Sequence, residues 1–204
     1  MNTLIIGTGN VGKTLAQKFQ ENNHQVKLYN ASGKIPEGFT KNHFATNLQA
    51  VVGETKLIVL AVPFEAVQSI FSGLTIQPET IVIDATNPIA SDMKSMSVGN
   101  TSSGAEKISE WLPNAQIVKA FNTTGWENMA DSSYQNGKLA MPYAGNDKKS
   151  KQAVARIIES FGFQPFDTGD LFMARFLEPM AMVWIYQGRI NSNNPNFGFS
   201  ILER

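Results

Sequence analysis

A glycine-rich turn near the start of the chain constrains the fold more than any other feature. Residues 7–12 read GTGNVG, directly after a short apolar run at residues 4–6. Apolar side chains then recur at helical spacing over residues 11–21. A strand, a G-x-G-x-x-G turn and a helix in this order are the dinucleotide-binding fingerprint of a Rossmann unit.

Each glycine of this turn has its own physical task. Gly7 permits the tight turn, Gly9 lets the backbone approach a pyrophosphate, and Gly12 allows the helix to pack closely on the strand. Unpaired N–H groups at the helix start then bind the anion. The alternative is a glycine-rich turn without a ligand, but the place of the motif between a strand and a helix favours the dinucleotide.

Strand-like and helix-like segments alternate along the rest of the chain. The expected strands occupy residues 4–6, 26–29, 57–62, 81–84, 116–120, 139–144 and 164–166. Pro142 lies inside one of them, so we expect a short or edge strand there. The alternation predicts an α/β fold of the Rossmann type, with a doubly wound, mostly parallel sheet and a C-terminal helical segment.

The end of the second predicted strand indicates which dinucleotide is bound. NAD-binding proteins usually place Asp or Glu there, on the ribose 2′-hydroxyl. Here residues 29–34 read YNASGK, and the next carboxylate is Glu37. Asn30 and Ser32 can donate hydrogen bonds to a 2′-phosphate, and Lys34 can supply positive charge. NADP(H) is therefore favoured, although the same residue types also form ordinary turns.

The chain divides into two expected parts. Residues 1–170 form the predicted NADP-binding Rossmann domain. Residues 171–204 form a C-terminal helix and tail that pack on the same domain or on a dimer partner. The helical part of this segment is rich in Met, Phe and Trp, which favours core and interface packing over direct cofactor contact.

Three predicted strand ends carry small or amide-bearing residues. They lie at residues 61–64 (AVPF), 84–88 (DATNP) and 119–124 (KAFNTT). Ligands of an open α/β sheet bind beyond the carboxyl ends of its strands, where such residues suit a flat nicotinamide ring. Pro and Asn are also common in plain strand-exit turns. Three such ends at one edge favour a site.

Six motifs follow one another along the chain, namely GTGNVG, LAVP, DATNP, VKAFNT, AGND and ARFLEPMAMVWI. Together they resemble the NADP-dependent oxidoreductases of the deazaflavin-coenzyme (F-420) reductase family. They also resemble the cytosolic domain of six-transmembrane ferric reductases, and the N-terminal part is similar to pyrroline-5-carboxylate reductase. The resemblance spans nearly the whole chain, and VKAFNT is its most specific element. It implies a homodimer, because the related families pack as dimers.

The resemblance also implies which residues contact NADP(H). They are Thr8, Gly9, Asn10 and Val11 at the pyrophosphate, Asn30, Ser32 and Lys34 at the 2′-phosphate, Ala61, Val62 and Pro63 at the ribose and nicotinamide, and Asn87, Ala120, Phe121 and Asn122 around the nicotinamide and the acceptor cleft. The chain departs from the family pattern at residues 30–31, where Asn-Ala stands in place of a frequent Ser-Arg.

The sequence lacks the residues of several kinds of catalytic site. The absence of cysteine excludes disulfides, thiolate catalysis and Cys-ligated metals. The two histidines, His24 and His43, lie in polar turn contexts and are interpreted as surface residues, and no metal site is expected. Hydride transfer to a flavin-like ring depends on alignment more than on a positioned acid, whereas carbonyl or imine reduction gains from a proton donor.

Composition limits the partners. Lys plus Arg and Asp plus Glu both number 17, so a formal net charge of zero gives no sign of nucleic-acid or anionic-membrane binding. Apolar runs are far shorter than a membrane span, and no secretory signal is evident. We expect a cytoplasmic protein with a small-molecule redox acceptor as its partner.

Three functional hypotheses follow. The leading one is an NADPH-dependent oxidoreductase that passes hydride to a flavin, a deazaflavin or a ferric chelate, with the flavin or deazaflavin as a possible second redox partner. The second is a small imine or carbonyl reductase. The third is a non-catalytic NADP(H) sensor whose nicotinamide pocket is closed or filled by a side chain such as Phe121.

Overall fold

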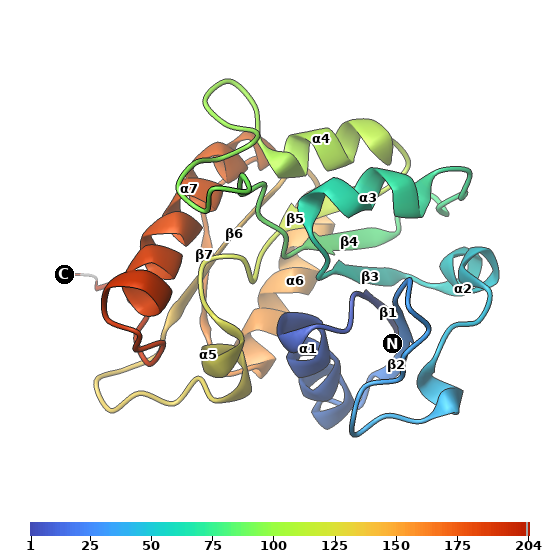
Figure 1. The fold of residues 1–204 in the computed structure, drawn as a ribbon, viewed down its shortest axis with the longest axis horizontal. Coiled ribbons are helices and arrows are strands. Elements are labelled where there is room, and N and C mark those ends of the chain that lie inside the picture. The colour runs from blue at the N-terminus through green and yellow to red at the C-terminus, as the bar shows by residue number, and fades with distance from the viewer. Residues whose placement is uncertain (203) are drawn as a thin grey trace.

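A seven-stranded sheet in the order β2-β1-β3-β4-β5-β6-β7 forms the centre of the molecule in a computed structural model that describes residues 1–202 and 204. The five parallel strands are β2 (Gln25–Tyr29), β1 (Asn2–Ile6), β3 (Leu57–Leu60), β4 (Ile81–Asp84) and β5 (Gln116–Lys119). β6 (Ala140–Gly145) runs antiparallel to β5, and β7 (Gln164–Asp167) runs parallel to β6. The predicted Rossmann-type sheet is confirmed (Figure 1).

Helices cover both faces of this sheet, as a doubly wound fold requires. The helices that contribute to the core on one face are α1 (Asn10–Glu21), α5 (Trp126–Ala130) and α6 (Lys148–Ser160). Those on the other face are α2 (Leu48–Glu54), α3 (Phe64–Phe71), α4 (Gly104–Trp111) and α7 (Ala174–Ile185). β1 serves both cores, because Ile5 points to the first while Leu4 and Ile6 point to the second.

The third strand of a usual Rossmann half is reduced to a single contact. Phe44 forms one parallel bridge with Leu28, and Ala45 N donates to Leu28 O at 2.8 Å. The segment between β2 and this bridge is loop, apart from the short helical turn η1 (Lys41–His43). The second crossover helix is therefore missing, and the chain returns to β3 through α2.

Pro142 does not place β6 at the edge of the sheet, so that prediction was wrong. β6 lies between β5 and β7, and Pro142 is buried. The paired residues on the β5 side are Gly145 and Ala144, beyond the proline. Because β5 pairs with only that end of β6, the missing N–H of Pro142 interrupts no hydrogen bond between the two strands.

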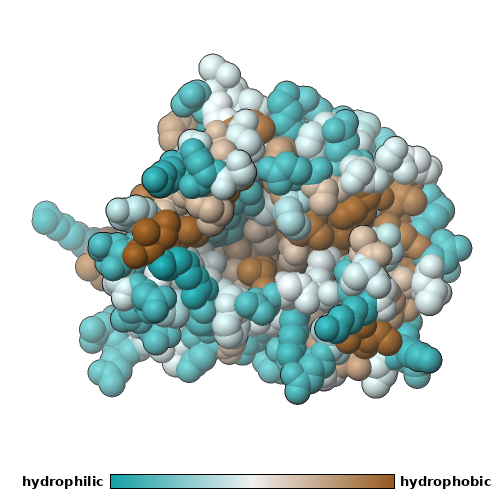
Figure 2. All heavy atoms as spheres, viewed as in Figure 1, coloured by the Kyte–Doolittle hydropathy of each residue, from teal (hydrophilic) through white to brown (hydrophobic). Residues whose placement is uncertain are grey.

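The C-terminal segment closes one side of the molecule. The turn η2 (Leu171–Met173), helix α7 and a final π-helical stretch η3 (Tyr186–Asn191) follow one another, and α7 contacts α4 and β6. Pro179 lies inside α7. The tail then folds back, and the Phe197 ring stacks on Trp184 at 5.6 Å between centroids. Figure 2 shows a hollow between this segment and α1, at the carboxyl ends of the strands.

Candidate functional site

Two positions of the turn between β1 and α1 accept only glycine. Gly7 has a φ of 105°, and a Cβ added there would clash with the carbonyl oxygen of Ala61. A Cβ added at Gly12 would clash with the carbonyl oxygen of Gly7. Both obstacles are backbone atoms, which cannot turn aside as a side chain can. These two glycines therefore allow β1, the end of β3 and α1 to meet closely.

Gly9 is different, because the fold itself does not require it. Its φ of −69° suits any residue, and a Cβ there would meet nothing within 4 Å. Gly9 is also the N-cap of α1, which no side chain caps, whereas Asn47, Ser103 and Asp147 cap α2, α4 and α6. The first N–H groups of α1 therefore have no side-chain partner beside open space, an arrangement that fits a pyrophosphate.

Asn30 joins the end of β2 to this turn. Its Nδ2 donates to Thr8 Oγ1 and, at 2.8 Å, to Lys34 O, while Ser32 Oγ donates to its Oδ1 at 2.9 Å. The structure thus brings residues predicted at the pyrophosphate next to those predicted at the 2′-phosphate. Glu37 is 95% exposed and pairs with Lys13 Nζ at 3.5 Å, so its carboxylate is engaged with α1.

The residues after β3 lie beside the glycine turn. Ala61 N donates to Ile6 O at 2.8 Å, which continues the β1–β3 ladder by one bond. Val62 is partly buried and packs on the second core. Pro63 is exposed and is the N-cap of α3. The predicted ribose and nicotinamide contacts therefore border the hollow next to Gly7.

Asn87 and Asn122 form a reciprocal pair between the ends of β4 and β5. Asn122 Nδ2 donates to Asn87 Oδ1 at 3.0 Å, and Asn87 Nδ2 donates to Asn122 O at 3.1 Å. Asn122 Nδ2 also donates to Leu177 O of α7 at 3.0 Å. Asn122 Oδ1 is buried and accepts no hydrogen bond from the described residues. The pair links two strand ends to α7 and leaves one acceptor open.

The Phe121 side chain points away from the strand ends where the nicotinamide is predicted. Strand alternation would place its ring on the same face as Lys119. A φ of 60° at Phe121 breaks the alternation and turns the ring into the first core, against Phe161 and Phe163. Ala120 also belongs to that core and is fully buried. Both residues can border a cofactor only through their backbone.

The sequence interpretation missed a buried ionic cluster behind the asparagine pair. Lys119 Nζ lies 2.9 Å from Asp84 Oδ2 and 3.0 Å from Glu178 Oε1, and all three side chains are at most 1% exposed. Glu178 caps α4 and its cationic partner is Lys119, whereas Arg175 binds Glu106.

Two of the three cluster residues left a signal in the sequence. Lys119 and Asp84 end neighbouring buried strands and lie directly opposite each other in the β4–β5 register. A charged residue at the end of a strand that is buried on both faces needs a partner, and the matching position of the next strand supplies one. Glu178 gave no such signal, because it comes from α7, far along the chain.

Burial and neighbouring charges shift the pKa values of Lys119 and Glu178. Burial alone would lower the pKa of Lys119, but the carboxylates of Asp84 and Glu178 outweigh it and raise the pKa. Burial raises the pKa of Glu178, against the opposing effects of Lys119 and the Gly104 N–H. Lys119 therefore remains a cation over the physiological range. Neither Asp84 nor Glu178 is exposed to a ligand in the hollow.

The histidines lie away from this cluster. His24 Nδ1 is 3.0 Å from Thr3 Oγ1, and partial burial and then the N-terminal charge lower its pKa. His43 Nδ1 accepts from Thr40 N at 3.2 Å. Both are half-buried, so neither is a freely exposed surface residue. Among the helices of the described residues, none is long and apolar enough to cross a membrane.

The fold and the site together define a Rossmann-type dinucleotide-binding protein. Residues 3–88 match the family described as NADP oxidoreductase, coenzyme F420-dependent. This match confirms the resemblance expected from the motifs and supports an NADP-dependent oxidoreductase.

Individual proteins agree with this assignment. The metalloreductase STEAP3 of Rattus norvegicus is 25% identical over 180 residues, which cover 87% of this chain and 36% of that protein. The chain thus spans about a third of the length of this relative. A crystal structure of a candidate F420-dependent NADP reductase from Arthrobacter sp. FB24 superposes with a TM-score of 0.87 at 25% identity over 100% of both chains. A hypothetical protein from Sinorhizobium meliloti gives 0.72 at 28% identity, over 85% of this chain and 88% of that one.

Proposed function

We propose that this protein is an NADPH-dependent reductase that passes hydride to a flavin or a deazaflavin, or passes the two electrons of NADPH to two equivalents of a ferric chelate with release of a proton. The observation that carries the proposal is the pairing of an open, uncapped helix start at Gly9 with the absence of a carboxylate at residues 30–34, directly after β2. The first feature suits a pyrophosphate and the second suits a 2′-phosphate. When bound there, NADPH supplies the hydride.

The nicotinamide end of the proposed site lies at the asparagine pair. Asn122 Oδ1 is a buried acceptor without a partner in the described part of the chain, and Asn87 is partly exposed beside it. Buried polar atoms rarely stay unpaired, so an orphan acceptor here fits the amide N–H of a carboxamide. The backbone of Ala120 and Phe121 would then border the ring.

The strand ends favour an acceptor that needs no positioned acid. Residues 61–64, 84–88 and 119–124 contain two titratable side chains, Asp84 and Lys119, and both are fully buried. Imine or carbonyl reduction gains from a proton donor within hydrogen-bond reach of the substrate. Hydride transfer to a flavin-like ring depends mainly on alignment. The site therefore supports a redox acceptor over an imine.

The structure does not support the sensor hypothesis at Phe121, the side chain that was suggested to fill the nicotinamide pocket. One form of that hypothesis filled the nicotinamide pocket with the Phe121 side chain, but the Phe121 ring packs on Phe161, with 5.6 Å between centroids, in the core. The ring is 1% exposed and turned away from the hollow.

Rapid mixing tests the proposed acceptor class. Protein loaded with NADPH is mixed separately with FMN, FAD, a deazaflavin and a ferric chelate, and the NADPH absorbance is followed. We expect oxidation with at least one acceptor, faster than in the absence of protein. Bound NADPH that none of the four acceptors oxidises would overturn the acceptor proposal while leaving NADPH binding intact.

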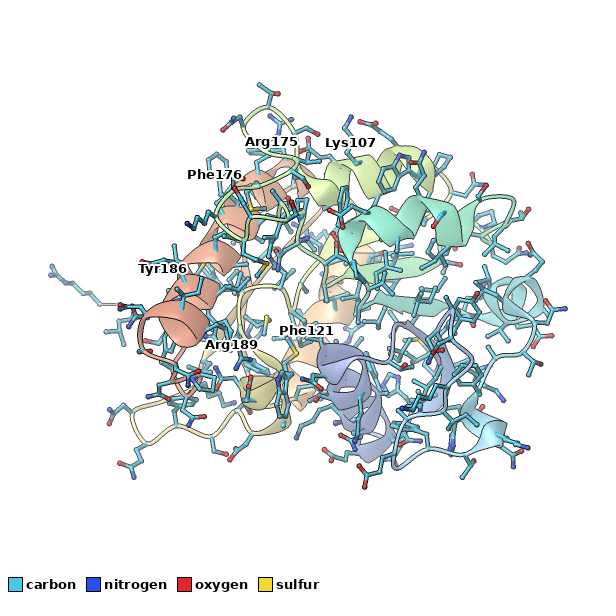
Figure 3. All side chains as sticks on the ribbon, viewed as in Figure 1. Lys107, Phe121, Arg175, Phe176, Tyr186 and Arg189 are labelled. Atoms are coloured by element: carbon cyan, nitrogen blue, oxygen red, sulfur yellow. The ribbon has the colours of Figure 1, made fainter. Side chains whose placement is uncertain are left out.

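We also propose that the chain forms a homodimer through an apolar stripe on its C-terminal segment. The stripe consists of Phe172, Phe176, Pro179, Val183, Tyr186 and Ile190, with successive spacings of 4, 3, 4, 3 and 4 residues. This is the spacing of a helix–helix seam. Its five non-proline members are between 48% and 61% exposed. Figure 3 shows Phe176 and Tyr186 on the outer side of the segment.

A second copy suits this stripe better than a charged partner does. Arg175 and Arg189 lie beside it, but each is paired with a carboxylate of its own chain, Glu106 at 2.6 Å and Glu127 at 2.7 Å. The rim is therefore close to neutral. A neutral, self-complementary apolar surface is the usual basis of a two-fold dimer interface.

A further inference from the structure

The buried cluster lies where four elements meet. Lys119 ends β5 and Asp84 ends β4, while Glu178 comes from α7. The Glu178 carboxylate accepts from Gly104 N at 2.9 Å and from Ala105 N at 3.0 Å, at the start of α4. One lysine thus joins two strand ends to two helices. Figure 1 shows α4 and α7 converging.

The cluster also fixes the turn that carries Asn87. Lys119 Nζ donates to Thr86 O, the carbonyl just before Asn87. Asp84 Oδ1 accepts from Thr86 N at 2.9 Å and from Thr86 Oγ1 at 2.7 Å. The N–H, the hydroxyl and the carbonyl of Thr86 are therefore all held by the charged pair, which restrains the chain just before Asn87.

The asparagine pair and the cluster close into a ring. Asn122 binds Asn87 on one side and Leu177 O on the other, and Leu177 directly precedes Glu178. Glu178 pairs with Lys119, and Lys119 Nζ donates to Thr86 O in the turn that carries Asn87. α7 is tied to the strand ends at two consecutive residues, once by an amide and once by a charge.

Stability alone is a weak reason for such a cluster. Removing charges from water costs several kcal/mol per ion in general, and apolar replacements of buried ion pairs are often as stable. A network in which each group has a fixed partner instead specifies one geometry. Here that geometry is the position of α7 relative to the strand ends on the nicotinamide side of the hollow.

We infer that Lys119 is a positioning residue that holds α7 against the ends of β4 and β5 and thereby sets the alignment between the nicotinamide and the hydride acceptor. The inference rests on the proposed function. Lys119 itself touches neither reactant, because its side chain is fully buried. It acts through Asn87, Asn122 and α7. The phosphate turn at Gly9 lies outside the ring and is independent of it.

Lys119→Met is the direct test, with three readouts. The affinity for 2′,5′-ADP, which carries the phosphates but no nicotinamide, should stay within about twofold. The rate of hydride transfer from bound NADPH should fall about 100-fold, the typical effect of a misplacement of about 1 Å. The kinetic isotope effect with NADPH deuterated at the transferred position should rise, because hydride transfer becomes the slow step.

Two further variants keep the test interpretable. Lys119→Met leaves the carboxylates of Asp84 and Glu178 buried without their cation. The double variant Lys119→Met/Glu178→Gln removes one of these two charges, and it replaces the single variant if that one does not fold. Lys151→Met is the matched control, since Lys151 also pairs with a carboxylate, Asp167 at 3.0 Å, but lies on α6. It should transfer hydride at the wild-type rate.

The outcomes separate the inference from the proposed function. Hydride transfer within threefold of wild type in the Lys119 variant, or an equal loss of 2′,5′-ADP affinity, would overturn the positioning role. If the wild type transfers hydride to no acceptor, the proposed function fails, and amide hydrogen exchange then decides the positioning role. Faster exchange in α7 and at residues 85–88 of the variant supports it, and unchanged exchange contradicts it.

Discussion

Lys34 is the cation of the segment that follows β2, and its side chain extends into solvent from an ordered loop. Its backbone N–H donates to Ser32 Oγ at 3.3 Å, and its carbonyl accepts from Asn30 Nδ2 at 2.8 Å. The loop is thus organised by its own hydrogen bonds before any ligand arrives. The ammonium group is free to pair with a 2′-phosphate, which NADP(H) has and NAD(H) lacks.

Lys34→Ala should therefore weaken NADPH binding and leave NADH binding unchanged. The expected loss is about twofold to fivefold, because an exposed ion pair contributes roughly 0.2–1 kcal/mol. Titration with both dinucleotides measures it. Lys41→Ala, which removes an exposed cation from η1, is the control. An equal loss for NADPH and NADH would show that Lys34 does not face the 2′-phosphate.

Residues with local causes could be predicted from sequence, and residues with distant partners could not. The tasks of Gly7 and Gly12 follow from the turn itself, which the neighbouring strand and helix define. The orientation of the Phe121 ring was not predicted, because a left-handed backbone at this position turns the ring to the other face of the sheet. The ion pair of Glu178 was not predicted, because its partner, Lys119, belongs to another element and no local sequence pattern relates the two.

At the scale of elements, the junction of α4 and α7 is held by a second ion pair nearer the surface. Arg175 Nε donates to Glu106 Oε2 at 2.9 Å and its Nη2 to Glu106 Oε1 at 2.6 Å. Glu106 also belongs to the capping arrangement of α4, since Ser103 Oγ donates to Oε2 at 2.8 Å. The hydrogen bond from Arg175 is the main reason that the pKa of Glu106 lies below its ordinary value.

This lowered pKa predicts an acid-sensitive contribution to stability. A carboxyl group whose pKa is lower in the folded chain stabilises the fold above its unfolded pKa of 4.5, and that contribution is lost as the pH falls through the folded value. Glu106→Gln should be about 1 kcal/mol less stable than wild type near pH 6, and the difference should shrink toward pH 3. Urea unfolding at both pH values measures it.

Glu110→Gln provides the control for that experiment. Glu110 also lies on α4 and pairs with Lys107 at 2.9 Å, but its side chain is 60% exposed. Its substitution should change stability little at either pH. A Glu106→Gln difference that stays the same at pH 3 and pH 6 would contradict the predicted linkage.

All seven strands were predicted as elements, including the partly exposed β2 and β7, but the place of β6 in the sheet was not. β1, β3 and β4 show as short apolar runs because each serves two cores. β6 was misplaced because its proline suggested an edge, while the structure uses only the far end of the strand to pair with β5. Whether a strand is internal depends on which other strands pair with it, and the local sequence does not determine that pairing.

At the scale of the whole molecule, the apolar stripe predicts the assembly state. Phe176→Glu and Val183→Glu each place a charge in the proposed apolar seam, where it would have to be buried. We expect the wild type to sediment as a dimer and both variants as monomers with an unchanged fold. Met93→Glu, at an exposed apolar site outside the stripe, should remain dimeric. A monomeric wild type at high concentration would contradict the interface.

The central claim is that NADP(H) binds at the glycine turn, and Gly9→Val tests it most directly. A Cβ at this position meets no atom within 4 Å, and the valine side chain would fill the space proposed for the pyrophosphate. Calorimetric titration should show that the wild type binds NADPH more tightly than NADH. Gly9→Val should keep the wild-type melting temperature and lose binding of both, whereas Gly12→Val should destabilise the fold. Gly9→Val that binds NADPH as tightly as wild type would contradict the account.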